Sequence, residues 1–251
     1  MQCQICNSKE IIFFFSKKKQ PIHIFPVKKN IDNRKIDLNV FICKNCFNGF
    51  LYPKFSKKLV DSFYKDDQSH YTSGAVPNFQ INRITNIFKK LKKIKRKFNN
   101  TLEIGGFDGD FLKKFKKYTK KSYLVEPNKQ GAQLAKRNGI TNIYNGFLDD
   151  VYTKKNSNFF DLIICRHVIE HVLNPQKLVD QISNMLKDGG ILVLETPDLN
   201  SIIRYGGTGS IVVHHLNYFS KNSLEQMTKK SFLKIASIHS KSDTATTLFL
   251  R

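Results

Sequence analysis

One stretch decides the fold of this chain: Thr101-Leu102-Glu103-Ile104-Gly105-Gly106-Phe107-Asp108-Gly109-Asp110-Phe111. A short apolar run ends there in an acidic residue and opens into three glycines within five positions. Apolar side chains at helical spacing follow, so the stretch predicts a strand, a tight turn and the start of a helix. A backbone with few side chains at the carboxyl edge of a sheet can approach a nucleotide-like ligand closely. A glycine-rich turn that binds nothing is the alternative at this point.

Strand and helix patterns alternate on the carboxyl side of this turn. The predicted strands cover 102–104, 122–128, 142–145, 160–165 and 191–194, and the predicted helices cover 129–138 and 175–186. This order predicts an α/β fold with a Rossmann-like, mostly parallel sheet and helices on both faces. A further helix is predicted over 79–98, with one apolar face and one lysine-rich face. The lysine-rich face is either solvated or a nucleic-acid contact.

Two cysteine pairs stand in front of this domain, Cys3-x2-Cys6 and Cys43-x2-Cys46. Four thiolates in two such pairs can surround Zn²⁺ tetrahedrally. With short strands at 11–15 and 36–42, the pattern predicts a zinc ribbon over residues 1–52. The alternative is four unligated structural cysteines.

Composition limits the remaining classes. The 251 residues contain no apolar run of about 18 and begin without a signal-peptide pattern, so neither a membrane span nor a secretory leader is predicted. Five cysteines in this setting favour a reducing cytoplasm. The net charge of +22 indicates either an anionic partner or a compositional bias, because lysine is spread along the whole chain.

Residues 53–98 connect the zinc ribbon to the α/β domain, which covers 99–251. A helix is predicted over 56–64, and a polar stretch with Tyr71 follows it. This connector is either a solvated linker or a lid over a site.

Acidic residues follow the second and third predicted strands. Glu126 ends the second strand about twenty residues after the glycines, where a carboxylate can hold both hydroxyls of a ribose. The same spacing would serve NAD, so these residues alone do not choose the cofactor. Asp149, after the third strand, is either a hydrogen-bond acceptor for an adenine amino group or a turn residue.

Four motifs together resemble one enzyme family. They are Glu103-Ile-Gly-Gly-Phe-Asp-Gly, Val125-Glu126-Pro127, the run from Phe160 to Pro175 that contains Arg166-His167-Val168-Ile169-Glu170-His171, and the run from Leu186 to Pro197. Over about residues 100–235 the chain resembles the class I S-adenosylmethionine-dependent methyltransferases. With the cysteine pairs, it is similar to the subgroup that has an N-terminal zinc-binding domain and includes sugar C-methyltransferases acting on nucleotide-linked deoxysugars. The resemblance implies a seven-stranded sheet whose last two strands, near 233–240 and 246–250, form an antiparallel hairpin.

The resemblance also implies a binding site for S-adenosylmethionine. Its residues would be Glu103, Gly105, Gly106, Phe107, Gly109, Glu126, Pro127, Leu148, Asp149, Arg166 and His167. Phe107 departs from the family's pattern, which has glycine in the middle of the loop. Of a Tyr-x-Glu-His cluster that the sugar C-methyltransferases carry after the fifth strand, only His215 is kept, because Val212 and His214 stand in place of Tyr and Glu. This departure favours O-methylation over C-methylation.

Methyl transfer to a hydroxyl needs an in-line acceptor and a base that takes its proton. Histidine suits this role because its ordinary pKa is near neutrality. His215 is the first candidate for the base and His171 the second, while Tyr71 loosely matches the family's lid tyrosine and would close the site.

The favoured function is methylation of a small anionic sugar, a sugar nucleotide or a related precursor of a surface polysaccharide or natural product. An RNA methyltransferase with a zinc module for RNA is the first alternative, although no stretch combines aromatic and basic residues as a stacking platform would. A non-catalytic zinc-containing binding protein is the second. An NAD enzyme fits least, since Gly-x-Gly-x-x-Gly is not matched. The oligomeric state is left open.

Overall fold

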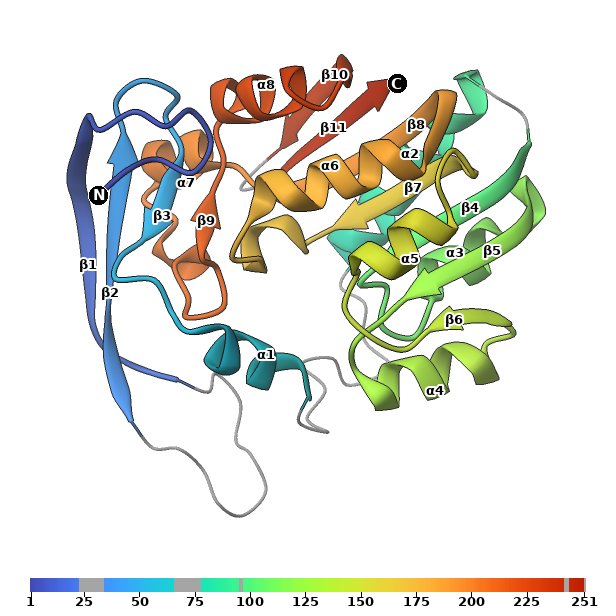
Figure 1. Ribbon diagram of the computed structural model, residues 1–251, viewed down its shortest axis with the longest axis horizontal. Helices are drawn as coiled ribbons and strands as arrows, with labels where there is room; N and C mark the ends of the chain where they lie inside the picture. The colour runs from blue at the N-terminus through green and yellow to red at the C-terminus, as the bar shows by residue number, and fades with distance from the viewer. Residues whose placement is uncertain (23–33, 66–77, 95–96, 242–243, 251) are drawn as a thin grey trace.

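The computed structural model describes residues 1–22, 34–65, 78–94, 97–241 and 244–250. These residues form a small antiparallel sheet and a larger, mostly parallel sheet flanked by helices (Figure 1). In the view of Figure 1 the small sheet stands at the left, the large sheet fills the right half, and helix α1 (Lys57–Lys65) lies below and between them.

The large sheet has seven strands in the order β10-β11-β8-β7-β4-β5-β6. Strands β4, β5, β6, β7 and β8 are parallel, whereas β11 pairs antiparallel with both β8 and β10. This confirms the predicted Rossmann-like sheet and its final hairpin. The strands are β4 (Phe98–Ile104), β5 (Thr119–Val125), β6 (Asn142–Tyr144), β7 (Phe160–Arg166), β8 (Leu186–Pro197), β10 (Lys234–Lys241) and β11 (Thr244–Leu250).

Helices connect these strands, and local sequence sets their starts. Asn128, Asp149 and Asn174 each accept a hydrogen bond from a backbone N–H in the first turn of the following helix. None of the described helices is long and apolar enough to cross a bilayer. Besides α1 the α-helices are α2 (Asn78–Ile94), α3 (Asp110–Phe115), α4 (Lys129–Arg137), α5 (Asp150–Lys155), α6 (Pro175–Met185), α7 (Leu199–Tyr205) and α8 (Lys221–Lys229), and the 3₁₀ turns are η1 (Lys116–Tyr118), η2 (Ile169–His171) and η3 (Thr208–Ser210).

Two predicted boundaries were wrong. The helix predicted over 79–98 ends as α2 at Ile94, and Phe98 begins β4 instead, where it is fully buried. Phe98 lies four residues after Ile94, so the sequence pattern alone continues the apolar face of the helix to Phe98. The helix predicted over 175–186 ends as α6 at Met185, and the strand predicted over 191–194 begins at Leu186 as β8, whose pairing with β7 has a register irregularity between Leu186 and Ile191.

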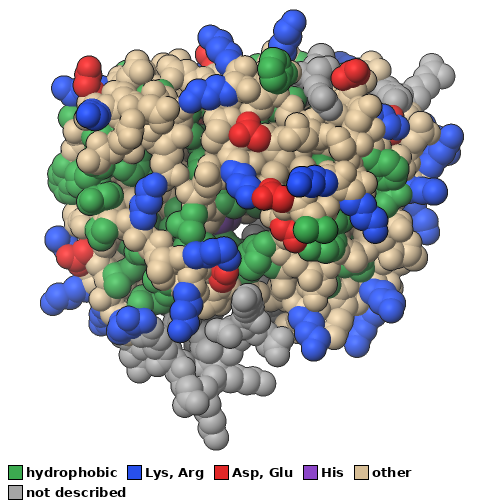
Figure 2. Space-filling model, viewed as in Figure 1, with side chains coloured by type: hydrophobic (Ala, Val, Ile, Leu, Met, Phe, Trp, Pro, Cys, Tyr) green, Lys and Arg blue, Asp and Glu red, His purple; other side chains and the backbone are tan. Residues whose placement is uncertain are grey.

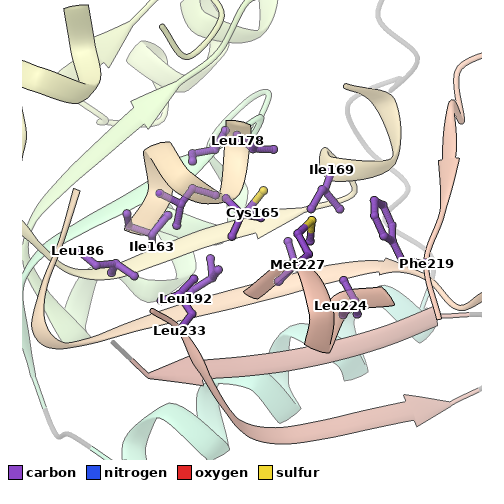
Figure 3. Packing of buried hydrophobic residues seen from close by; sticks show 14 of the residues in the cluster. Ile163, Cys165, Ile169, Leu178, Leu186, Leu192, Phe219, Leu224, Met227 and Leu233 are labelled. Atoms are coloured by element: carbon purple, nitrogen blue, oxygen red, sulfur yellow. The ribbon is translucent and has the colours of Figure 1, made fainter. Parts of the chain in front are cut away.

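The core lies on both faces of β7 and β8, and the alternation of side chains along a strand explains why. Ile163 and Cys165 face α6 and α8, where they meet Leu178 and Met227 (Figure 3). Leu162 and the other alternate residues face α2 and α3. Each large apolar side chain that is fully buried stabilises the fold by about 1.5–3 kcal/mol. Cys165 is buried in this core on β7 and is not one of the four cysteines whose sulfurs cluster.

The small sheet joins the two ends of the chain. It contains β1 (Ile11–Pro21), β2 (Lys35–Cys43), β3 (Gly49–Leu51) and β9 (Asn217–Tyr218), in the order β1-β2-β3-β9. The fourth strand therefore comes from the C-terminal third of the chain, and no sequence pattern predicted it. The segment before β9 contains His215, and its Leu216 N–H donates to the backbone oxygen of Glu170, which follows the carboxyl end of β7.

Candidate active site

The glycine loop lies at the carboxyl end of β4 and has an open backbone. Gly105 and Gly109 have φ angles of 69° and 68°, a region that favours glycine. A Cβ at Gly106 would lie 2.6 Å from the Glu103 carboxylate, so only glycine fits there. Phe107 also has a positive φ, 48°, and its ring covers Gly131, where a Cβ would lie 2.6 Å from the ring. The loop can therefore bring backbone N–H groups close to a ligand.

Glu126 follows β5 beside this loop. The Phe107 and Asn128 N–H groups donate to its two carboxylate oxygens, each at 2.8 Å. Burial raises the pKa of Glu126, and these two hydrogen bonds act in the opposite direction. Each oxygen keeps acceptor capacity for a further donor. The carboxylate is thus rigidly held at the sheet edge, where it can accept from the hydroxyls of a ribose.

Glu103 is buried beneath the loop. Its Oε2 has no hydrogen-bond partner among the residues that the structure describes. Burial raises the pKa of Glu103 to about 8, with the positive charge of Arg166 acting against it. A cation bound beside this group would favour its charged form, and S-adenosylmethionine carries a sulfonium and an ammonium group. The glycine cradle and this carboxyl group together fit the cofactor that the sequence predicts.

Asp149 acts as a helix cap. It accepts hydrogen bonds from Tyr152 N at 2.7 Å and from the Tyr144 hydroxyl at 2.5 Å. The hydrogen bond from Tyr144 lowers the pKa of Asp149. Asp149 thus caps α5, and each of its oxygens keeps acceptor capacity for a further donor, so a hydrogen bond to an adenine amino group stays a prediction. Leu148 beside it is half-buried against the core, and Pro127 is half-buried after Glu126.

His167, directly after β7, contacts two glutamates. Its Nδ1 lies 3.1 Å from Glu170 and its Nε2 lies 3.3 Å from Glu195, whose other oxygen accepts from Arg166 Nε at 2.8 Å. Burial lowers the pKa of His167, but the two carboxylates outweigh it and raise the pKa to about 9. Burial acts to raise the pKa of both glutamates, yet their hydrogen bonds with His167 and the nearby positive charges bring each to about 2. The ends of β7 and β8 are therefore locked together by a charged network.

His171 and His215 lie next to this network and face each other. Their ring centroids are 4.9 Å apart. The Nδ1 of His171 lies 2.8 Å from the backbone oxygen of His214, and the Nδ1 of His215 lies 2.7 Å from that of Ser210. Burial lowers the pKa of His171 to about 4 and also lowers that of His215. Two neutral imidazoles, predicted separately from the sequence, are thus brought together.

Helix α1 covers these histidines. The Tyr64 ring lies 6.0 Å from that of His171, and the Phe63 ring lies 4.4 Å from that of His214. Figure 2 shows histidine atoms in a hollow near the centre of this face. Tyr71, the predicted lid tyrosine, lies outside the described residues. The sequence reasoning missed Tyr64 as an aromatic residue at the site, and it did not assign roles to Glu170 or Glu195.

The four paired cysteines form a separate cluster. Cys3 and Cys46 have their sulfurs 3.5 Å apart, as do Cys6 and Cys43, and all four sulfurs lie within 4.8 Å of one another. In a tetrahedral zinc site with Zn–S bonds of about 2.3 Å, sulfurs lie about 3.8 Å apart. The cysteines are not joined in disulfides. Their arrangement is consistent with a closed zinc site.

A family model described as "Methyltransferase domain" matches residues 79–237, which is more than half of the chain. The match begins in α2 and spans the glycine loop, the histidine cluster and β9. A search of the curated proteins gives no match.

Solved structures share the fold at low sequence identity. The N-methyltransferase NodS from Bradyrhizobium japonicum, bound to S-adenosyl-L-homocysteine, has a TM-score of 0.53 and 19% identity, covering 69% of this chain and 88% of its own. A chain of the Haloferax volcanii complex between the Trm112 methyltransferase activator and a methyltransferase has a TM-score of 0.54 and 12% identity, covering 70% and 99%. The PH0226 protein from Pyrococcus horikoshii has a TM-score of 0.55 and 15% identity, covering 78% and 99%. At these identities the likeness concerns the fold.

Proposed function

The chain belongs to the methyltransferase-domain family and is an S-adenosylmethionine-dependent methyltransferase, and from that premise we propose that it methylates a hydroxyl of a small anionic sugar. The acceptor class includes sugar nucleotides and related precursors of surface polysaccharides or natural products. In this proposal residues 99–251 bind the cofactor and acceptor, residues 53–98 cover the site, and residues 1–52 hold zinc. The reaction takes place in the cytoplasm, where the thiols stay reduced.

The observation that carries this proposal is the histidine pair at the carboxyl edge of the sheet. A carbonyl oxygen only accepts hydrogen bonds, so the Nδ1 of His171 and that of His215 each carry the proton. The Nε2 of each neutral ring is then the acceptor nitrogen. A hydroxyl placed between this pair and the cofactor loop could lose its proton to one of them.

The chemistry is a single displacement. The acceptor oxygen forms a bond to the methyl carbon as the bond from that carbon to the sulfonium sulfur breaks, and the sulfur keeps the electron pair. The hydroxyl proton goes to His215, or to His171 if His215 is dispensable. S-adenosylhomocysteine and the methyl ether leave. Bringing the reacting atoms into line supplies much of the rate enhancement.

The cofactor in this proposal lies along the glycine loop. Glu126 holds the ribose and Glu103 lies near the cationic end, while Phe107 and Leu148 supply apolar contact. Arg166 and His167 are further predicted cofactor contacts, and both also contact Glu195, while His167 in addition contacts Glu170. The remaining predicted contacts are Gly105, Gly106, Gly109, Pro127 and Asp149.

Two further features support the anionic acceptor and the metal. Lysine and arginine are scattered over the face shown in Figure 2, so the net charge of +22 gives a diffuse positive field that would concentrate a phosphorylated substrate. The four cysteines would hold one structural Zn²⁺, because protein ligands fill all four positions.

The test combines an acceptor panel with one variant. Purified enzyme and methyl-labelled cofactor are incubated with nucleotide-linked sugars, sugar phosphates and RNA transcripts, and the best acceptor is kept. We expect a sugar acceptor, and His215→Ala should then lower kcat about 10²- to 10⁴-fold with S-adenosylhomocysteine affinity unchanged. Tyr205→Ala, an exposed aromatic on α7, is the control and should keep full activity.

One result would contradict the sugar acceptor, and another would correct the assignment of the base. If the enzyme methylated RNA and none of the sugars, the acceptor would be RNA and the zinc module would be interpreted as an RNA-binding domain. If the His215→Ala variant kept full activity, the role of general base would be assigned to His171.

A further inference from the structure

We propose that Glu170, His171 and His215 bind one divalent transition-metal cation on the acceptor side of the active site. The three residues can each present a ligand atom, and these atoms lie within 4.8 Å of one another. This inference rests on the proposed function, because the cation would act on the same acceptor hydroxyl, and it replaces one part of that proposal: with the cation bound, the histidines hold the metal and the proton leaves to solvent. It concerns a different site from the four cysteines, which lie in the N-terminal part of the chain.

The orientation of the imidazoles is the first argument. His171 points its Nδ1 at the backbone oxygen of His214, and His215 points its Nδ1 at that of Ser210. Both rings therefore turn their Nε2 lone pair away from these carbonyls and keep it for another partner. Histidines that ligate metals show this same arrangement, in which the second ring nitrogen donates to a carbonyl or carboxylate and fixes the ring.

The fixed carboxylate is the second argument. Glu170 is fully buried, and its oxygens contact His167 Nδ1 at 3.1 Å and Thr196 Oγ1 at 3.2 Å. Its own backbone oxygen accepts from Leu216 N at 2.7 Å, which ties it to the segment that carries His215. A buried carboxylate with a hydrogen-bond partner on each oxygen has the support expected of a metal ligand.

The spacing is the third argument. Glu170 Oε1 lies 3.9 Å from His171 Nε2. A first-row cation with bonds of about 2.0–2.2 Å holds neighbouring ligand atoms about 3–3.5 Å apart. Side-chain movements of about 1 Å would therefore close the site around an ion. Three protein ligands leave open positions for an acceptor oxygen, as in catalytic and unlike structural sites.

A cation at this point would change how the histidines act. The acceptor hydroxyl would bind in an open position, and the positive charge would lower its pKa so that the proton passes to solvent water. The resulting alkoxide attacks the methyl carbon, and the carbon–sulfur bond breaks toward sulfur. The histidines then act by holding the cation, and no Nε2 needs to take the proton directly.

Mn²⁺ is the probe for this site, because it favours a carboxylate such as Glu170 and does not compete for the soft thiolates of the cysteines. The intact 251-residue chain, with zinc on its cysteines, is titrated with Mn²⁺, and the free ion is followed by electron paramagnetic resonance. We expect one Mn²⁺ per chain, with affinity at least tenfold weaker in Glu170→Gln and in His215→Gln. Glu225→Gln on α8 is the matched control, because its carboxylate pairs with Lys221 outside the cluster, and it should bind Mn²⁺ normally.

Folding and cofactor binding are measured on the same samples. If the Glu170→Gln variant unfolds, the affinity of the His215→Gln variant for Mn²⁺ is the test of the site, since the His215 side chain is less buried than that of Glu170. Absence of Mn²⁺ binding to folded wild-type protein that still binds S-adenosylhomocysteine would overturn the metal site and leave the proposed function standing. Failure to bind S-adenosylhomocysteine would instead contradict the proposed function. On the best acceptor, we expect a chelator that spares the zinc to lower activity at least tenfold and added Mn²⁺ to restore it. Unchanged activity would also overturn the inference.

Discussion

At the residue scale, Phe107 shows how one position can depart from its family's pattern and keep the loop. Its backbone has a φ of 48°, where a residue other than glycine carries about 1–2 kcal/mol of strain. Its N–H donates to Glu126, and its ring covers Gly131. The loop thus keeps the conformation that a glycine would give, and the aromatic ring adds an apolar wall beside the predicted ribose site.

Glu126 should be the residue on which cofactor affinity depends most. Glu126→Ala removes a charged acceptor that also orients the Phe107 and Asn128 N–H groups. A hydrogen bond to a charged group contributes about 1.5–3 kcal/mol, so we expect the Kd for S-adenosylhomocysteine to rise roughly 10- to 100-fold. Isothermal titration calorimetry measures this, with Glu225→Gln as the control. An unchanged Kd would show that the ribose binds elsewhere.

Glu103 should make the ligand-free protein sensitive to pH. Its pKa is raised by burial from 4.5 to about 8, so the folded state binds this proton more tightly than the unfolded state does. The contribution of Glu103 to stability is therefore fully present below about pH 4.5 and is lost as the pH rises through about 8. Urea unfolding between pH 5 and pH 9 checks this. We expect stability to fall less steeply in Glu103→Gln; an identical slope would contradict the prediction.

At the element scale, helix α1 stabilises the segment that carries the histidines. Phe63 is buried and its ring contacts His214. Phe63→Ala should lower the free energy of unfolding by about 3–5 kcal/mol, as expected for a large core aromatic. Lys58→Ala on the exposed side of the same helix should change it by less than about 0.5 kcal/mol. Equal stability of the two variants in urea titrations would show that α1 does not pack on this segment in solution.

The sequence predicted long, periodic elements and missed short ones. Strand β7 was predicted correctly because Leu162 to Cys165 are all apolar. Glu126 was proposed as a ribose ligand because an acid ends a strand after a glycine loop. Strand β9 has only two residues, so it carries no periodicity, and its pairing with β3 depends on tertiary contacts. Glu170 and Glu195 also follow strand patterns, and their position at the carboxyl edge was the signal that could have drawn attention to them.

At the scale of the whole molecule, the cysteine cluster is part of the main hydrophobic core. Cys3, Cys43 and Cys46 belong to the same buried cluster as Cys165 and Met227. A zinc ion bound there would therefore stabilise both sheets together. Its loss would destabilise the large sheet as well as the N-terminal module.

Removal of the zinc should accordingly lower the melting temperature of the whole chain, which should still unfold in one cooperative transition. If zinc contributes at least about 4 kcal/mol, its removal by a strong chelator should lower Tm by roughly 10 °C in this chain. Differential scanning calorimetry measures the shift, and elemental analysis before and after counts the zinc. Cys165→Ala is the control for a cysteine outside the metal cluster and should keep one zinc per chain. Protein purified without added metal that holds almost no zinc would refute the site.

The pairing of β3 with β9 also sets an order of events during synthesis. About 165 residues separate Leu51 from Asn217, so a ribosome needs roughly ten to thirty seconds to supply the fourth strand. The contacts from Ser220 to Cys46 and from Lys230 to Ile5 come equally late. Throughout that interval the nascent module has an unpaired strand edge at β3, which the shortness of that strand helps to protect from pairing with other chains. Early capture of zinc by the four thiols would hold the module together until its last strand emerges.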